Sequence, residues 1–327
     1  MRWITSLSVT TDLKFGSAGI ITIRVTRMPF TPLRSVKATG ALCASYLGNQ
    51  MLTTLDANPQ EWMQGDKKVI HTVSACHFES IAHAEHWINL LIPKDSNGKL
   101  VKWSGGRRKD TTRRKFIENC LKNKSDIDFT INSISTTEGE MSWFAWALYF
   151  QNQSLVSQRM DNKKRNCLVF KGLNGREFSF PVLRAGYLIW YQHVIRYLVE
   201  FKNINGKFLS DNFCADEIGP GDGKALSVAF VNYLLNLSVN KPQVSLPTND
   251  RFSRLDAISD YMCGWVSSVK ATIAPIEYEA MLKKFEASRP ESIDNIEYVM
   301  NLNITDENGN DVTNQVKLAV ANGVNDS

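Results

Sequence analysis

The sequence predicts an α/β protein with a mixed sheet that starts as a three-strand antiparallel meander and carries flanking helices. Strand-like runs joined by short turns fill the first fifty residues, and apolar residues at helical spacing alternate with short strands after them. Of the 327 residues, 43% are hydrophobic and 22% are charged, which is the composition of a globular protein that can bury a full core.

The meander is expected within residues 1–50. Residues 3–11 alternate in polarity, residues 20–25 are mostly β-branched, and residues 38–47 are small and apolar. Glycines and prolines separate these three runs. Three consecutive strands with short connections favour antiparallel pairing.

The rest of the chain mixes strands and helices. Strands are predicted at 69–73, 128–134, 208–214 and 243–246, and helices at 78–91, 141–150, 178–201, 225–237, 255–269 and 277–287. Residues 1–275 are interpreted as one domain with helical insertions, and residues 276–327 as an acidic C-terminal helix and tail.

Charge divides the chain in the same way. The net charge is +5, but residues 276–327 hold ten acidic and four basic side chains, which leaves +11 on residues 1–275. A basic body favours a polyanionic partner, and an ordinary solvated surface with a charged terminus is the alternative.

The six cysteines are widely spaced and form no Cys-x-x-Cys pair, which argues against a structural zinc site. Apolar neighbours, as at Cys43 and Cys263, indicate buried thiols in a reducing compartment. The chain also shows no signal-peptide core and no apolar run of about 18 residues. We therefore expect a cytoplasmic protein without a membrane partner.

Most catalytic motifs are missing. The sequence contains no Walker A loop, Gly-x-Ser-x-Gly elbow or His-Glu-x-x-His helix, and the glycine-rich residues 219–224 have the wrong spacing for a phosphate loop. A histidine cluster remains as a candidate metal site, with surface or partly buried histidines as the simpler interpretation; it comprises His71, His77, His83 and His86.

A basic segment at 102–115 is the candidate nucleic-acid contact. It holds seven basic residues and one acid, so it can neutralise several phosphates with little sequence specificity. The alternative is a solvated helix entry, and residues 163–165 are a candidate extension. The predicted contacts are Lys102, Arg107, Arg108, Lys109, Arg113, Arg114 and Lys115.

Acidic residues at strand ends and on helices form the candidate catalytic set. Carboxylates that converge from a first strand, a helix, a later strand and a late helix can hold two hard cations for phosphodiester hydrolysis. Each acid taken singly is also explained as a cap, a turn residue or an ion-pair partner. The predicted catalytic residues are Asp12, Glu138, Glu140, Asp216 and Asp260, with Asp12, Asp216 and Asp260 as the metal ligands.

This arrangement resembles the ribonuclease-H-like fold over roughly residues 1–270. More narrowly, it resembles an uncharacterised bacterial family that opens with Tyr-Ile-Asp-Glu-Ser and ends its core with a helix carrying Gln-x-Ala-Asp. The late segment 251–261 matches through Asp260, whereas Ala257 and Ser259 stand where that family has glutamine and alanine. At the first motif, Asp12 is followed by Leu13 and Lys14 rather than Glu-Ser-Gly.

The resemblance implies a Mg²⁺- or Mn²⁺-dependent nuclease that acts on DNA or RNA, with a role in defence against foreign nucleic acid. A second hypothesis is a non-catalytic subunit that binds nucleic acid or protein in a larger intracellular assembly, including assemblies with a second copy of this chain. The incomplete first motif, the eight tryptophans and the acidic tail favour this second hypothesis.

Overall fold

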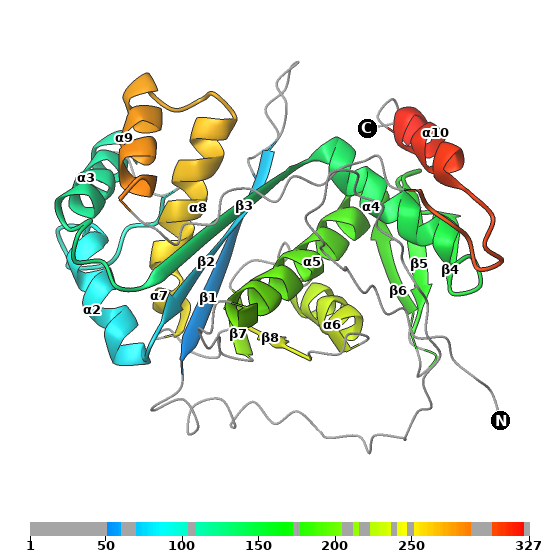
Figure 1. Cartoon of the computed structure of the whole chain (residues 1–327), viewed down its shortest axis with the longest axis horizontal. Coiled ribbons are helices and arrows are strands. Elements are labelled where there is room, and N and C mark those ends of the chain that lie inside the picture. The colour runs from blue at the N-terminus through cyan, green and yellow to red at the C-terminus, as the bar shows by residue number, and fades with distance from the viewer. Residues whose placement is uncertain are drawn as a thin grey trace.

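A computed structural model describes residues 51–59, 70–103, 109–172, 175, 177–204, 212–215, 223–236, 241–246, 252–288 and 303–323. The three strands expected within residues 1–50 lie outside this part of the chain. In the described part, the molecule is an α/β protein in which helices cover both faces of a mixed five-stranded sheet (Figure 1). None of the described helices has the length and apolar character that crossing a bilayer requires.

The main sheet has the strand order β3-β2-β1-β7-β8, so β1 is central. β1 pairs antiparallel with β2, which pairs antiparallel with β3, while β7 runs parallel to β1 and β8 runs parallel to β7. The bounds are β1 Leu52–Pro59, β2 Ile70–Phe78, β3 Thr130–Thr137, β7 Asn212–Ala215 and β8 Gln243–Ser245.

One face of this sheet is covered by helices from the middle and the late part of the chain (Figure 1). These helices are α2 (Ile81–Leu91), α3 (Lys109–Lys122), α7 (Phe252–Leu255), α8 (Ala257–Lys270) and α9 (Ile276–Glu286). Their core includes the fully buried Phe116, Tyr261 and Trp265. α9 adds Tyr278, Leu282 and Phe285 to the same core.

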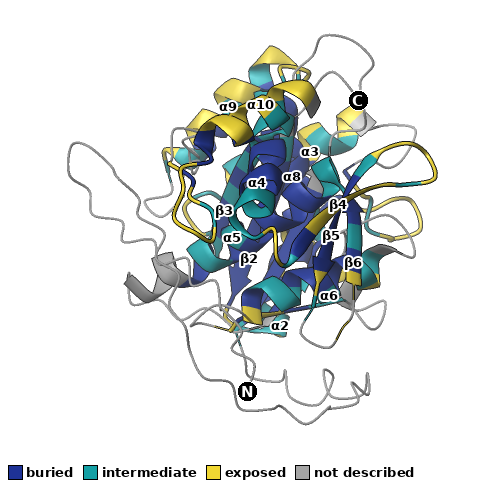
Figure 2. Ribbon diagram, turned by 90° about the vertical axis from the view of Figure 1, so that its right-hand side faces the viewer, coloured by how far each residue is buried: buried dark blue, intermediate teal, exposed yellow. Residues whose placement is uncertain are grey.

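The opposite face carries α4 (Glu138–Gln151), α5 (Val182–Ile204) and α6 (Gly223–Asn236). A second antiparallel sheet, β4 (Val156–Met160), β5 (Asn166–Lys171) and β6 (Glu177–Pro181), belongs to the core on this side. α10 (Thr313–Gly323) adds Val316 to it. Figure 2 shows the buried strands enclosed by helices such as α9 and α10, whose outer surfaces are exposed.

Side chains alternate along a strand, so neighbouring residues of β1 face opposite sides of the main sheet. Leu55 and Ala57 of β1 join the core under α4 and α5. Thr54 faces α8, where its hydroxyl lies 2.8 Å from the Ser259 hydroxyl. Because successive side chains of a strand point to opposite faces, Asp56 lies on the same face as Thr54.

Three surface turns share one hydrogen-bond pattern. Asp95, Asp161 and Asp306 each accept bonds from the backbone N–H groups two and four residues later. The residue three positions after each aspartate has a left-handed backbone: Gly98 (φ 75°), Lys164 (φ 60°) and Gly309 (φ 85°). Glycine adopts this conformation without the steric cost of a Cβ atom, so Lys164 is strained where the other two turns are not.

Lys164→Gly is therefore expected to stabilise the chain by about 0.5–1 kcal/mol, because relief of the left-handed strain exceeds the extra backbone entropy of glycine in the unfolded chain. Urea unfolding of the full chain measures this change. Lys163→Gly is the control, since Lys163 is not among the described positive-φ residues. A Lys164→Gly variant no more stable than the wild type would contradict the strain argument.

Candidate functional site

Asp56 is the acidic residue at the centre of the main sheet. It lies in β1, is 9% exposed, and its Oδ1 accepts the backbone N–H of Ala57 at 2.7 Å. Its register partner on β2 is Ser74, whose hydroxyl lies 2.7 Å from that of Ser133 on β3. A polar row thus runs across three strands on the face covered by α8. Burying a carboxylate is costly unless hydrogen bonds or a cation compensate it.

The chain around β1 and α8 is fixed by buried polar contacts. Besides the bond between Thr54 and Ser259, the Cys263 thiol lies 2.9 Å from the Thr72 carbonyl oxygen, to which it donates. Ser259 and Cys263 are one turn apart on α8 and both are fully buried. These contacts position Asp260, the residue after Ser259, on a helix that is held directly against β1 and β2.

Asp260 binds the segment that leads into the basic region. Its Oδ2 accepts the backbone N–H of Trp103 at 2.8 Å. The Trp103 ring lies against the backbone of Gly264, where an added Cβ atom would come within 2.2 Å of the ring. Asp256, the N-cap residue of α8, is 5% exposed and lies one turn before Asp260.

Two of the predicted metal ligands, Asp12 and Asp216, lie outside the described residues. Asp216 follows Ala215, the last residue of β7, and Ala215 pairs with Leu55, the residue before Asp56. Within the described part of the chain, no group of three or more His, Cys, Asp or Glu side chains is arranged to hold a metal ion.

Glu138 and Glu140 lie at the start of α4. Thr137 caps this helix, and Glu140 Oε2 accepts bonds from the Thr137 N–H at 2.7 Å and from the Thr136 hydroxyl at 3.1 Å. Burial raises the pKa of Glu138 above its ordinary value. These hydrogen bonds explain Glu140 as a capping residue of α4.

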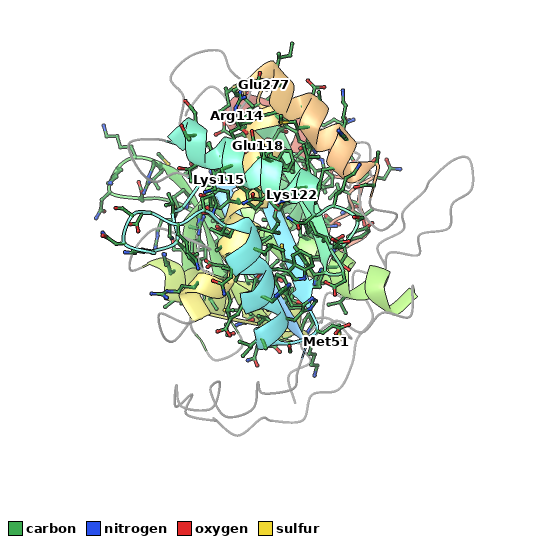
Figure 3. All side chains as sticks on the ribbon, turned by 90° about the vertical axis from the view of Figure 1, so that its left-hand side faces the viewer. Met51, Arg114, Lys115, Glu118, Lys122 and Glu277 are labelled. Carbon is green, nitrogen blue, oxygen red and sulfur yellow. The ribbon has the colours of Figure 1, made fainter. Side chains whose placement is uncertain are left out.

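The basic segment is only partly available for a ligand. Arg113 donates from Nε to the Trp103 carbonyl at 3.1 Å and lies 4.7 Å from the centre of the Trp103 ring. Arg114 forms an ion pair with Glu277 of α9. Lys102 and Lys115 are exposed, whereas Arg107, Arg108 and the Lys109 side chain lie outside the described residues. Figure 3 shows Arg114 and Lys115 on α3, with Lys122 further along the same helix.

The four predicted histidines do not form one metal site. Buried His77 lies 2.9 Å from both the Thr53 hydroxyl and the Asn132 amide. His83 lies 2.7 Å from Asp128, and His86 is exposed with its ring edge-on to Trp87. His83 and His86 therefore contact different neighbours.

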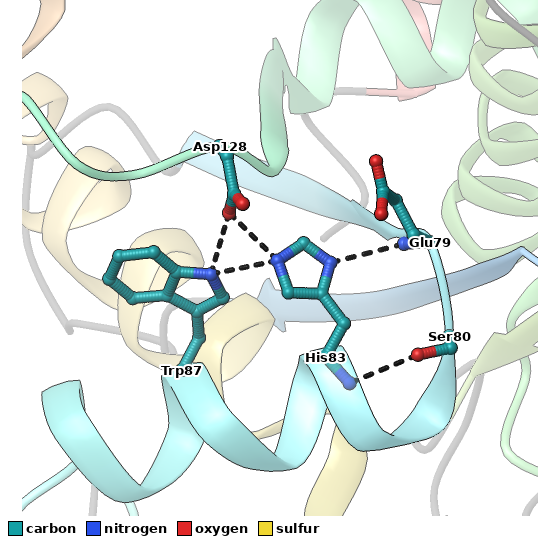
Figure 4. A network of polar contacts seen from close by, with 5 residues as sticks. All are labelled: Glu79, Ser80, His83, Trp87 and Asp128. Atoms are coloured by element: carbon teal, nitrogen blue, oxygen red, sulfur yellow. Dashed lines mark hydrogen bonds and ion pairs between the residues drawn. The ribbon is translucent and has the colours of Figure 1, made fainter.

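His83, Trp87 and Asp128 form the polar network of Figure 4. The Nδ1 atom of His83 accepts the Glu79 N–H at 3.2 Å, so in the neutral ring Nε2 carries the hydrogen and donates to Asp128. The Trp87 indole N–H also donates to Asp128, at 2.8 Å. Together these bonds tie α2 to the chain segment that enters β3.

Asp128 is expected to stabilise the fold only while it is ionised. Partial burial opposes ionisation, but the hydrogen bonds from His83 and Trp87 outweigh it and lower the pKa of Asp128. A carboxylate whose pKa is lower in the folded chain stabilises above its unfolded pKa of about 3.9 and loses this effect as pH falls through the folded value. Asp128→Asn should therefore lower the free energy of unfolding by about 0.5 kcal/mol at pH 7, since exposed pairs are screened.

Chemical unfolding at pH 7 and pH 3 checks this, with the exposed Asp126→Asn as the control. The difference between wild type and Asp128→Asn should shrink at pH 3. An equal difference at both pH values would mean that the charge of Asp128 contributes nothing.

Cys43 lies outside the described residues, and four of the five cysteines within them are buried, as their neighbours predict. Cys76, Cys120, Cys167 and Cys263 are buried, and Cys214 is half-buried; all are free thiols. Burial and the nearby Asp161 raise the pKa of Cys167, which keeps that thiol protonated and unreactive.

No family model, no curated protein and no solved structure matches this chain.

Proposed function

We propose that the chain is a metal-dependent nuclease with a ribonuclease-H-like core, in which Asp56 takes the role expected of Asp12. Support comes from the sheet: β1, β2 and β3 are the first three strands of the described residues and pair antiparallel, and β1 carries an acidic residue. The later strand β7 runs parallel to β1 beside it.

The main support for this proposal is the contact between α8 and β1 next to Asp56. Thr54 and Ser259 meet at 2.8 Å. Asp56 follows Thr54 by two positions on the same face of β1, and Asp260 follows Ser259 by one position on α8. A first-strand carboxylate and a late-helix carboxylate thus come from elements that touch at this point.

Asp56, Asp260 and, following β7, Asp216 are the proposed ligands of Mg²⁺ or Mn²⁺. Carboxylate oxygens are the ligands that these hard cations prefer. The bound ions would activate a water molecule and stabilise the leaving oxygen of a phosphodiester. The chain itself would supply the fixed carboxylates and the exposed lysines Lys102 and Lys115 for the phosphate backbone.

The second candidate is a nucleic-acid-binding subunit without turnover. Two observations favour it: Lys102 and Lys115 are exposed and can contact phosphates, and the described residues alone contain no group of three metal-ligating side chains. A chain with a nucleic-acid-binding surface but an incomplete metal site would bind nucleic acid without cleaving it.

A cleavage assay distinguishes the two candidates. Labelled single- and double-stranded DNA and RNA are incubated with the full chain in Mg²⁺ or Mn²⁺, with a chelator as the blank. Wild type is compared with Asp216→Ala, Asp260→Ala and the exposed control Asp126→Ala. Loss of cleavage in the first two variants alone supports the nuclease, and salt-sensitive binding without cleavage by any form supports the subunit. Equal cleavage by all four forms would reject the carboxylate assignment.

A further inference from the structure

The turn that joins β4 to β5 has the same backbone as two other turns of the chain but carries different side chains. In each turn the N–H of the leading aspartate donates to the carbonyl four residues later, and its carbonyl accepts the N–H three residues later. The third and fourth residues are asparagine and glycine in the turns that start at Asp95 and Asp306. In the turn between β4 and β5 these positions hold Lys163 and Lys164.

Lys164 is strained in a position where glycine would not be. Its backbone is left-handed, with φ 60°, and both other turns have glycine at the corresponding residue. Glycine makes the same backbone hydrogen bonds without the steric cost of a Cβ atom. The turn itself therefore gives no reason for a lysine, and a strained residue that the turn does not need indicates a function for its side chain.

The end of this hairpin is strongly basic. Lys163 and Lys164 are exposed, and among the described residues no carboxylate forms an ion pair with either of them. Arg165 is exposed and pairs with Asp161 at 2.7 Å, and Arg159 on β4 is exposed as well. Residues 159–165 thus hold four basic side chains and one acidic side chain.

The β4–β5 hairpin lies on the opposite side of the main sheet from the basic segment at 102–115. Leu168 and Phe170 of β5 belong to the core under α4 and α5, whereas Trp103 and Phe116 belong to the core under α8. Figure 1 shows β4 and α3 at opposite ends of the molecule. Residues 163–165 are therefore a second basic surface and not an extension of the first.

The polar residues beside the turn suit a phosphate backbone better than a lipid surface. Residues 157–160 of β4 are exposed, and Ser157, Gln158 and Asn162 can donate hydrogen bonds to phosphate oxygens. A segment that enters a lipid surface carries several large apolar side chains. Met160 is the only such side chain within residues 157–166.

We propose that the β4–β5 hairpin binds the phosphate backbone of nucleic acid through Arg159, Lys163 and Lys164. A cation that contacts a phosphate releases a counterion, so its contribution falls with salt and does not depend on base sequence. The proposal rests on the nucleic-acid partner of the proposed function, but not on cleavage or on a metal ion. A chain that binds nucleic acid without cleaving it would use the hairpin in the same way.

The double substitution Lys163→Asn with Lys164→Gly is the test variant. It gives this turn the residues of the other two turns, so the backbone is kept and the strain is relieved while two positive charges are removed. The variant should be at least as stable as wild type in urea, so weaker binding would not result from unfolding. The matched control is Lys94→Gln with Lys99→Gln, which removes two exposed cations at the Asp95 turn.

Fluorescence anisotropy of a labelled DNA duplex measures binding by the full chain, with a chelator present to prevent cleavage, between about 50 and 200 mM salt. The hairpin variant should bind at least about tenfold more weakly at low salt, and the slope of log affinity against log salt should fall by about two. The control should bind as wild type does. Equal affinity and slope in wild type and the hairpin variant, or an equal loss in the control, would overturn the proposal.

Two further outcomes separate this proposal from the proposed function. Metal-dependent cleavage by a chain whose hairpin variant binds DNA as wild type does would reject the hairpin and leave the nuclease standing. Vesicles of phosphatidylserine and phosphatidylcholine form the second comparison. Vesicle binding that is lost in the hairpin variant, with DNA binding unchanged, would identify a lipid surface as the partner and contradict the proposal.

Discussion

Asp56→Asn is expected to lower metal-dependent cleavage by about a thousandfold or more, which is the largest effect on activity that the proposed site predicts. Asparagine keeps the shape of the side chain but removes the negative charge that would hold the cation. The side chain is almost fully buried in the central strand, so no neighbouring acid can take its place without moving β1.

The measurement is the single-turnover cleavage rate at saturating metal, with circular dichroism to confirm folding. Asp126→Asn is the control, because it removes an equal charge from an exposed position away from β1. An Asp56→Asn variant that cleaves at the wild-type rate would exclude Asp56 from the metal site.

Gly186→Ala is expected to have the largest effect on stability. α4 and α5 cross where Gly186 lies, and a Cβ atom there would come within 1.9 Å of the Met141 carbonyl oxygen and 2.5 Å of its carbon. These are backbone atoms of α4, so the two helices must separate to admit a methyl group. Overpacking of this kind costs about 3 kcal/mol or more, and the better helix propensity of alanine offsets about 1 kcal/mol of it.

The net loss of at least about 2 kcal/mol is measured by urea unfolding. Gly139→Ala in α4 is the matched control, because a Cβ atom there meets only the Thr137 hydroxyl, at 4.0 Å, and the variant should be as stable as wild type or slightly more stable. If Gly186→Ala unfolds at the wild-type urea concentration, α4 and α5 do not cross as closely as the structure indicates.

Much of the main sheet could be predicted from local patterns. The strands expected at 69–73 and 128–134 correspond to β2 and β3, and the helices expected at 78–91 and 141–150 correspond to α2 and α4. A β-branched run indicated β2, a dense aromatic run indicated α4, and Ser80 and Thr137 cap α2 and α4. Residue composition was thus a sufficient signal even for β2, whose residues 72–78 are all buried.

β1 was missed because it is buried on both faces and because only two residues from Leu52 to Ala57, the two leucines, are large and apolar. Residues from Leu52 to Ala57 are all buried, so the run has no alternation between polar and apolar residues. The β-branched Thr53 and Thr54 between Leu52 and Leu55 were the available signal. With β1 unrecognised, Asp56 could not be identified as the acid of a central strand.

The predicted helix at 178–201 contains a strand and a helix. β6 ends at Pro181 and α5 begins at Val182, and β6 pairs with β5, which the sequence analysis did not predict. Proline has no N–H and fixes φ, so it is favourable at such a boundary. The second sheet is therefore a correction to the predicted order of elements.

Tertiary pairing explains why the binding sites were harder to predict than the fold. The ion pair of Arg114 with Glu277 joins residues that are far apart in the sequence. The composition indicates that residues 1–275 are basic overall. Only the folded structure shows that a basic side chain such as Arg114 already forms an ion pair.

The most direct test of the central claim is a titration of the full chain with Mn²⁺, followed by calorimetry or by the electron paramagnetic resonance of the free ion. Wild type should bind Mn²⁺ saturably, and Asp56→Asn should bind it at least about tenfold more weakly while Asp126→Asn binds as wild type does. Equal Mn²⁺ affinity in wild type and Asp56→Asn would contradict a metal site at the centre of the sheet.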